Sequence, residues 1–308
     1  MLPGMIRSLC LVALLSSAAA CTMWKSPQQS QREWADKMTP KPLGATAAPP
    51  PARAVVRLRA LVDAQYISQN AGWEQRVRAL VTRANGLSEG RFGVRFELVS
   101  VGAWDHPPAT TLPPLLEQLR AEQPEGDVDL VVGFTSSLQL FTSSFEEVGL
   151  AYLFGHHAVL RGIDQHEQSD VILRELRALS VDERVAVVRA RVEHQEAIVF
   201  LHEWGHLAGA LHDRDPAYIM FPNYRDTQRD FSPAGTKSIE LALQHLRGDR
   251  RAWLAAAEAH LRGLPRSALA DGSAEQLAGL FGSPDAGTPA ALAAAEERPL
   301  SEADRQLF

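Results

Sequence analysis

Three histidines and one glutamate are spaced in this chain as a metal site requires. The segment from His202 to His212 reads H-E-x-x-H-x-x-G-x-x-H. On a helix, residues four apart such as His202 and His206 lie on one face, where two neutral imidazoles can bind one Zn²⁺. Glu203 points about 100° around the helix from the first ligand. Its carboxylate can therefore reach a water molecule at the metal without displacing it.

A glycine and a third histidine complete the pattern. Gly209 follows His206 by three residues. Because glycine adopts a positive φ at little steric cost, the helix is expected to end there and the chain to turn back. The turn would bring His212 to the metal and leave a fourth position open for water, as in catalytic zinc sites. The predicted chemistry is hydrolysis: Glu203 accepts a proton from the attacking water and passes it to the leaving amine.

The long motif and the methionine-containing turn after it resemble the active site of the metzincin zinc endopeptidases. The distance from the third histidine to Met220, and the M-x-P pattern that begins there, are most similar to the matrixins. The resemblance implies one catalytic zinc ion, Glu203 as the general base and Met220 as the hydrophobic floor under the metal. It assigns zinc ligation to His202, His206 and His212.

Two residues near the motif depart from this likeness. Asp213 stands where matrixins usually carry Ser, and in this respect the chain looks more like the adamalysins or snapalysins. Its carboxylate is expected to anchor nearby backbone or orient a ligand; the alternative is a surface turn residue. Tyr224 lies four residues after Met220, so it does not match the extra tyrosine ligand of astacins and serralysins. A packed aromatic is expected, with a role at an oxyanion or in the specificity pocket as the alternative.

Residues 1–21 are typical of a secretion signal. Arg7 supplies positive charge, and the apolar stretch 9–20 is too short to span a bilayer. The ending S-S-A-A-A-C resembles the lipobox of bacterial lipoproteins, in which Cys21 would be lipidated. Ordinary cleavage after Ala20 is the alternative. We expect a lipid-anchored protein that faces the periplasm or the exterior. Because the other cysteine, Cys10, lies within the signal, no disulfide is expected.

Composition divides the rest of the chain of 308 residues. Residues 22–52, rich in Gln, Ser, Pro and Ala, predict a disordered tether. Residues 53–262 would form the catalytic domain. The Ala-, Gly- and Pro-rich tail 263–308 is expected to be partly helical or disordered. The formal charge is −6 and no basic stripe is present, so nucleic acid is not an expected partner. A protein or peptide substrate and a monomeric state are favoured.

Hydrophobic periodicity predicts strands over 54–62, 92–101, 128–134 and 148–160, and helices over 73–84, 112–122, 181–211, 233–246 and 251–261. This order agrees with an α+β metzincin-like fold. A mixed twisted sheet would pack behind the long active-site helix, and a small helical subdomain would follow at the C-terminal end. By the resemblance, residues 150–160 would form the edge strand of the cleft, where an extended peptide can pair.

Other histidines and other functions stay open. His156 and His157 fall on that strand, and Asp164 and His166 follow it. Matrixins hold a structural zinc and calcium ions near this region, but the spacing here differs, so surface or rim histidines are expected. The chain could also be a zinc-binding interaction module that cleaves nothing, or a zinc amidase that acts on cell-wall crosslinks. A zinc endopeptidase is favoured, because a site without catalysis would be expected to lose Glu203.

Overall fold

The computed structural model describes residues 25–43, 54–107, 109, 111–136, 148–163, 165–246 and 248–281. The predicted signal and Cys21 therefore lie outside the described residues. The described residues form two compact units, one within 25–40 and 165–191 and one within 41–163 and 192–281. No helix within the described ranges is both long and apolar enough to cross a membrane.

Among its described residues, the smaller unit contains three helical segments: α2 (Pro27–Met38), α7 (Gln165–Glu175) and the start of α8 (Val181–Leu207). A capping box begins α2: the Ser26 hydroxyl accepts from the Gln29 N–H at 3.1 Å, and the Gln29 side chain accepts from the Ser26 N–H at 3.0 Å. Pro27 occupies the first turn, where its missing N–H costs nothing. The prediction of a disordered tether over 22–52 is therefore wrong for this helix, because local capping outweighs the polar composition.

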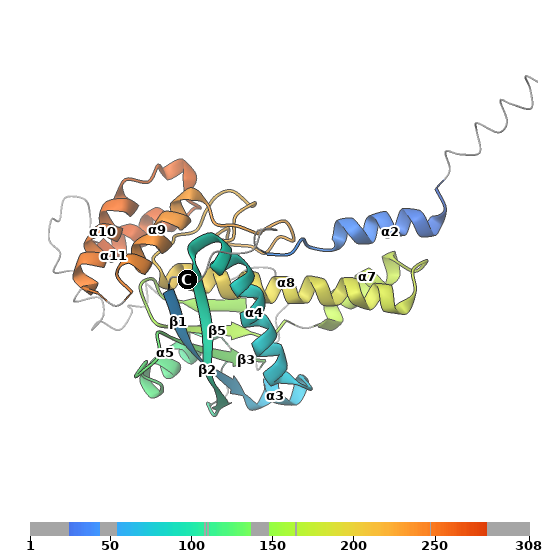
Figure 1. Ribbon diagram of the computed structural model, residues 1–308, viewed down its shortest axis with the longest axis horizontal. Coiled ribbons are helices and arrows are strands. Elements are labelled where there is room, and N and C mark those ends of the chain that lie inside the picture. The colour runs from blue at the N-terminus through green and yellow to red at the C-terminus, as the bar shows by residue number, and fades with distance from the viewer. Residues whose placement is uncertain are drawn as a thin grey trace, which may run out of the picture. The chain divides into compact units, whose positions relative to one another are not determined.

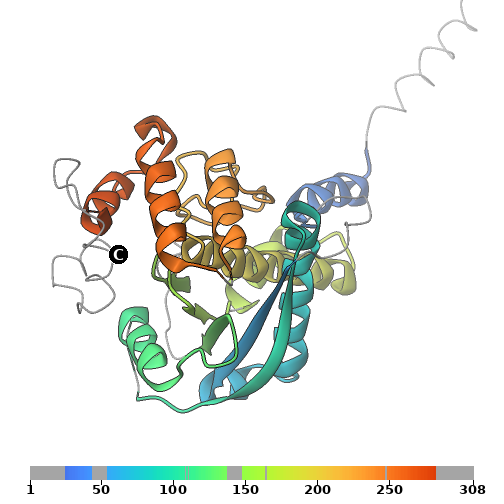
Figure 2. The same cartoon turned by 60° about the vertical axis from the view of Figure 1, so that its left-hand side comes forward.

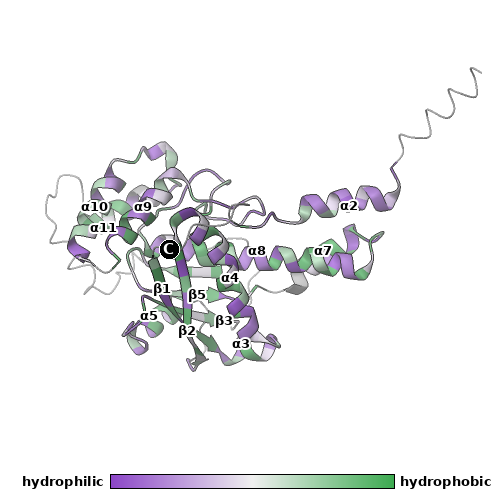
Figure 3. Ribbon diagram, in the orientation of Figure 1, coloured by the Kyte–Doolittle hydropathy of each residue, from purple (hydrophilic) through white to green (hydrophobic). Residues whose placement is uncertain are grey.

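The larger unit is built on one mixed sheet with the strand order β2–β1–β3–β5–β4 (Figure 1). The strands are β1 (Ala54–Asp63), β2 (Val94–Trp104), β3 (Leu130–Thr135), β4 (Gly149–Ala151) and β5 (His157–Arg161). All neighbouring strands are parallel except β4, which runs antiparallel to β5 at the edge. The central strands are mainly hydrophobic, whereas α2 of the smaller unit is mainly hydrophilic (Figure 3). The predicted α+β fold is confirmed.

Helices cover both faces of this sheet. One face of β1, including Leu58 and Val62, packs against α4 (Trp73–Phe92) and the end of α8. The opposite face, including Leu61, packs against α5 (Leu112–Glu122). A short helix, α3 (Ala64–Gln69), follows β1, and the Asp63 carboxylate caps its start. The zinc-motif helix is therefore held against one face of the sheet, as the family resemblance predicted.

The predicted strand over 148–160 is wrong in one respect, because it is two strands. Phe154 has a φ of 61°, and the Gly155 N–H donates to the Tyr152 carbonyl at 3.1 Å, so the chain reverses between β4 and β5. Of these two strands only β4 lies at an edge of the sheet, and β5 lies between β3 and β4. The helix predicted over 73–84 also continues to Phe92, where Gly93 ends it with a φ of 66°.

The C-terminal part is helical within the described residues (Figure 2). It comprises α9 (Pro233–Gln244), α10 (Arg250–Arg262), the 3₁₀ turn η1 (Arg266–Ala268) and α11 (Ser273–Phe281). Ser232 is the N-cap of α9, and its hydroxyl accepts from the Gly235 N–H at 3.1 Å. A separate hydrophobic cluster joins these helices to Phe154 and Leu211. The first part of the predicted tail, residues 263–281, is therefore ordered against the end of the zinc motif.

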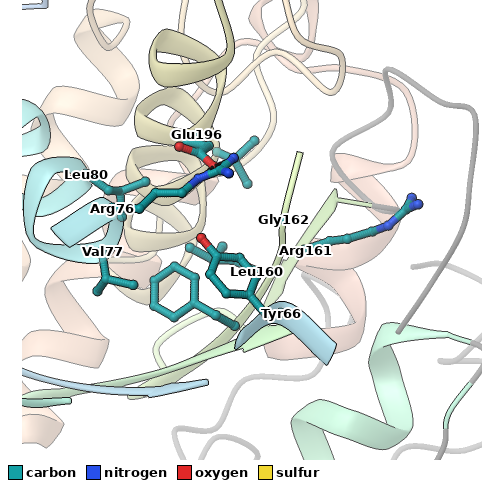
Figure 4. A pocket seen from close by; sticks show the side chains of 10 residues that line it. Tyr66, Arg76, Val77, Leu80, Leu160, Arg161, Gly162 and Glu196 are labelled. Carbon is teal, nitrogen blue, oxygen red and sulfur yellow. Dashed lines mark hydrogen bonds and ion pairs between the residues drawn. The ribbon is translucent and has the colours of Figure 1, made fainter. Parts of the chain in front are cut away.

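A buried ion pair fixes α8 against α4 ahead of the zinc motif. Arg76 Nε donates to Glu196 Oε1 at 2.8 Å, and Figure 4 shows the two side chains facing each other with the Tyr66 hydroxyl directed toward them. Burial raises the pKa of Glu196, and the Arg76 charge opposes that shift. A pocket of about 10 Å³ beside this pair has room for about one water molecule. Removing one partner of a buried ion pair leaves an uncompensated buried charge, which is strongly destabilising. The pair therefore holds α8 in its position beside α4.

Candidate active site

Three imidazole nitrogens converge on one point. The Nε2 atoms of His202 and His206 are 3.1 Å apart, and that of His212 lies 3.2 Å and 3.1 Å from them, respectively. Two nitrogens at 2.0–2.1 Å from a tetrahedral zinc ion would be about 3.3–3.4 Å apart. Among the described residues, these histidines form the one group of three side chains placed to share a metal ion.

In two of the three rings, a hydrogen bond from Nδ1 determines which nitrogen faces the metal. His202 Nδ1 donates to the Ile219 carbonyl at 2.7 Å, and His206 Nδ1 donates to the Ala210 carbonyl at 2.9 Å. A carbonyl oxygen only accepts, so each Nδ1 carries the proton and each Nε2 keeps a lone pair. Lone pairs that face each other at 3.1 Å repel unless a cation lies between them. The donor set therefore fits one catalytic Zn²⁺.

Burial also keeps these rings neutral. Desolvation lowers the pKa of His206 to about 4 and that of His212 to about 3, and it lowers the pKa of His202 well below its usual value. A histidine with an ordinary pKa of about 6.5 is mostly protonated at pH 5.5. The buried rings are instead mostly neutral at this pH, which is the form that binds zinc.

This shift predicts how many protons zinc displaces. Three ordinary histidines would release roughly 2.7 protons at pH 5.5, whereas rings that are already neutral release almost none. We expect fewer than one proton per zinc in the Glu203→Gln variant, in which the neighbouring carboxyl cannot contribute. Calorimetric titration in buffers of different ionisation enthalpy measures this number. A release near 2.7 protons would contradict the assigned pKa shifts.

Glu203 lies against the edge strand. It is 2% exposed, and its carboxylate accepts a hydrogen bond from the backbone of Ala151. Gly149 leaves the space that the carboxylate occupies, because a Cβ there would lie 2.5 Å from Glu203 Oε1. Burial raises the pKa of Glu203 well above its usual value, which makes the carboxylate a stronger base. The sequence analysis did not find Gly149 or Ala151, since a short strand far from the motif carries no signal of this contact.

The turn after α8 brings the third histidine to the other two. The helix ends at Leu207, two residues before Gly209, where its end was predicted. Gly209 has a φ of 85°, and the Ala210 N–H donates to the Gly205 carbonyl at 2.8 Å. A Cβ at Gly209 would overlap the ring of Phe154, 2.9 Å from Cζ. Both the backbone conformation and the close approach of the ring therefore require glycine.

Gly209→Ala is expected to lower the free energy of unfolding by about 2 to 5 kcal/mol, since it combines a strained positive φ with overpacking. Gly272→Ala is the matched control, because Gly272 also has a positive φ of 88° but no atom lies within 4 Å of its Cβ position. Denaturant unfolding of both variants separates the two causes. Equal losses would show that the Phe154 ring contributes nothing.

The methionine turn holds the ligands through its backbone. The Ile219 carbonyl binds His202, and the Met220 carbonyl accepts from the Asp213 N–H at 2.9 Å. Met220 is fully buried, and a Cβ at Gly205 would lie 3.2 Å from its Cε atom. Asp213 is 4% exposed, burial raises its pKa to about 6, and Ser232 forms a hydrogen bond with its carboxylate. Asp213 is therefore an ordered internal residue and not a surface turn residue.

Gln228, which was not predicted as a site residue, holds the loop after Met220 in place through side-chain hydrogen bonds. Gln228 is completely buried, and its amide donates to the carbonyls of Tyr218 and Asn223 at 3.0 Å each. Nothing in the sequence distinguishes this glutamine from its polar neighbours.

Tyr224 is half-buried, packs against the main core, and its hydroxyl lies 2.9 Å from His194 Nδ1.

His157 of β5 and the preceding His156 do not form a second ligand group with the other described residues. His157 is 5% exposed, and its Nε2 lies 2.7 Å from the Gln123 carbonyl. Of the two expected alternatives, a surface position is therefore wrong for His157, because β5 is an internal strand. His156 lies 3.3 Å from the Asp129 carbonyl through Nδ1. Asp164 and the side chain of His166 fall outside the described residues.

The family model described as metallo-peptidase family M12, of the reprolysin type, matches residues 52–239. This match spans more than half of the chain. The chain therefore belongs to that family. The protein is therefore a metzincin-like zinc metallopeptidase, a hydrolase whose substrates are peptides or proteins. The narrower likeness to matrixins is not supported by this match.

Solved structures with a similar chain path include three with low sequence identity. Archaemetzincin from Methanopyrus kandleri is 18% identical, with 62% of this chain and 96% of that chain covered and a TM-score of 0.40. Metalloproteinase-II from Bacteroides fragilis is 12% identical, with coverages of 67% and 57% and a TM-score of 0.40. A chaperone–substrate complex is 12% identical, with coverages of 62% and 34% and a TM-score of 0.39. No curated protein matches the sequence.

Proposed function

We propose that this metallopeptidase is an endopeptidase that uses Glu203 as its general base. One observation carries the proposal: the three Nε2 atoms lie 3.1–3.2 Å apart, and the residue beside the first ligand is a buried carboxylate. Zinc, when His202, His206 and His212 hold it, supplies a Lewis acid that polarises a carbonyl and lowers the pKa of water toward about 7.

The chain's own residues supply the proton transfer. Glu203 would accept a proton from the attacking water and deliver it to the leaving amine. Its raised pKa suits both steps, because a group that titrates nearer the reaction pH accepts and returns a proton readily. The backbone carbonyls that hold His202 and His206 keep the ligand rings in one tautomer while this happens.

The edge strand β4 would hold the substrate. A strand at the edge of a sheet can pair with an extended peptide through its free backbone groups. The position of β4 in the strand order supports this proposal, as does the contact between the Ala151 backbone and Glu203. A peptide paired there would lie beside the catalytic carboxylate. The loop fastened by Gln228 would then shape the pocket for the residue after the cleaved bond.

Cleavage of a peptide library tests the endopeptidase proposal. Mass spectrometry should find cuts at internal bonds that disappear with a zinc chelator and return when zinc is added back. His212→Ala is the control that removes one ligand. A zinc-loaded protein that cuts no peptide but binds a partner would instead be an interaction module. Cleavage of purified peptidoglycan without cleavage of peptides would point to a cell-wall amidase.

We also propose that the enzyme works outside the cytoplasm, anchored by a lipid on Cys21. The lipobox-like ending of residues 1–21 supports this location. In cells grown with labelled fatty acid, the wild-type protein should carry label and sediment with membranes, whereas Cys21→Ser should lose the label. An unlabelled wild-type protein whose mature chain begins at Cys21 would show ordinary signal cleavage instead.

A further inference from the structure

His212, the third zinc ligand, lies in a segment whose backbone is hydrogen-bonded on both sides. On one side, the Asp213 N–H donates to the Met220 carbonyl at 2.9 Å. On the other, the Arg214 N–H donates to the Ala268 carbonyl and the Ala270 N–H donates to the His212 carbonyl, each at 3.0 Å. Backbone groups of successive residues in an extended segment point to opposite sides, which matches this pattern. Residues 212–214 therefore lie between the methionine turn and the segment 268–273.

The segment 268–273 lies beyond the part of the chain that the family model matches, which ends at residue 239. It forms an antiparallel bridge in which Leu269 pairs with Asp213. Leu269 is buried in the cluster that also contains Leu211 and Phe281. The ion pair between Arg214 and Asp271 is exposed and adds little. Apolar packing and backbone bonds, rather than surface charge, hold the segment in place.

His212 differs from the other two ligands in how its ring is oriented. His202 and His206 each have Nδ1 bonded to a backbone carbonyl. Within the described part of the chain, the only bonding distances of the His212 ring are to those two rings. A metal ligand without an outer partner of its own depends on its backbone for orientation. The backbone of His212 is fixed through its carbonyl, which accepts from Ala270.

The surroundings of residues 213–218 make this backbone pairing important. A cavity of about 560 Å³ opens between these residues, the start of α9 and the end of α10. Side-chain packing is therefore incomplete on this side of the third-ligand segment. On this side, the observed backbone bonds of the third-ligand segment are those to Ala268 and Ala270.

We propose that the segment 268–273 positions His212 and thereby sets how tightly the protein holds zinc. Ala270 is the central positioning residue, because its N–H binds the carbonyl of the ligand itself. This inference deepens the proposed function, since it rests on His212 binding the zinc ion. It also gives residues beyond 239, which the family model does not match, a role in positioning a zinc ligand.

Ala270→Pro in the full chain tests the proposal, because proline removes the N–H that binds the His212 carbonyl. The preceding residue, Leu269, has φ −91° and ψ 145°, which is a conformation that proline accepts. We expect zinc affinity, measured by competition with a chromophoric chelator, to fall about tenfold to hundredfold. The visible spectrum of the cobalt-substituted protein should also change. Ala270→Gly keeps the N–H and should stay within about threefold of wild type.

A measurement without substitution guards against a variant that does not fold. If the segment positions His212, zinc must in turn stabilise the segment, because coupling between two sites is reciprocal. Zinc should therefore slow hydrogen exchange of the Ala270 and Arg214 amides more than that of amides in α4. Unchanged protection, or an Ala270→Pro protein with wild-type zinc affinity and cobalt spectrum, would overturn this proposal alone. A wild-type protein that binds no zinc would overturn both proposals.

Discussion

Glu203→Gln is expected to lower kcat/KM for peptide cleavage by about 10²- to 10⁴-fold, which is the usual contribution of a general base. The amide has nearly the same shape as the carboxylate, but it cannot accept the proton of the attacking water. The loss should appear in kcat, because the amide removes a transition-state step rather than substrate binding. Glu203→Ala should lose cleavage as well. Steady-state kinetics with a peptide from the library measures both.

Zinc binding is the control for this result. Glu203 is not one of the three converging ligands, so both variants should hold zinc as the wild type does. A variant that keeps its zinc and still cleaves at the wild-type rate would contradict the assignment of Glu203 as the base. A variant that loses zinc would show instead that Glu203 supports the metal site.

Gly149→Ala is expected to lower kcat about 100-fold without weakening zinc binding. The added Cβ would lie 2.5 Å from Oε1 and 2.9 Å from Cδ of Glu203, so the carboxylate must move. A misplacement of about 1 Å at a catalytic group can cost about 100-fold in rate. The three atoms nearest to that Cβ all belong to Glu203, so the metal should remain. Kinetics and zinc content measured on the same preparation test this expectation.

Gly102→Ala is the matched control. Gly102 is also in a strand, and the nearest atom to its Cβ position is Leu61 Cδ2 at an ordinary 3.5 Å. This variant should keep near-wild-type activity. Equal activity of the two variants would mean that Gly149 does not set the position of Glu203.

Local signals explain why much of the fold could be predicted from the sequence. The helix over 112–122 has prolines in its first turn, and its observed bounds match the prediction. Ser232, a residue type favoured at helix N-caps, begins α9 directly before its predicted start at residue 233. Composition was a poorer guide in residues 22–52, where the capping box of Ser26 and Gln29 forms a helix. A short reversal at Phe154 and Gly155 likewise divides one predicted strand into two, because apolar residues flank the glycine on both sides.

The candidate site also has one part that could be predicted from the sequence and one part that could not. The ligand motif is local, so its spacing alone predicts that His202 and His206 share a helix face and that a turn follows at Gly209. The residues around the ligands come from distant parts of the chain. Gly149 lies beside Glu203, and Ala270 binds the His212 carbonyl, yet neither residue type marks such a contact. Only the folded backbone brings them together, so periodicity and spacing could not reveal them.

Anomalous X-ray diffraction at the zinc absorption edge, on crystals of the zinc-loaded protein, tests the central claim most directly. We expect one strong peak about 2.0–2.1 Å from the Nε2 atoms of His202, His206 and His212, with the carboxylate of Glu203 outside direct bonding distance. A peak bound through Nδ1, a peak that excludes His212, or no peak at these residues would contradict the three-histidine zinc site.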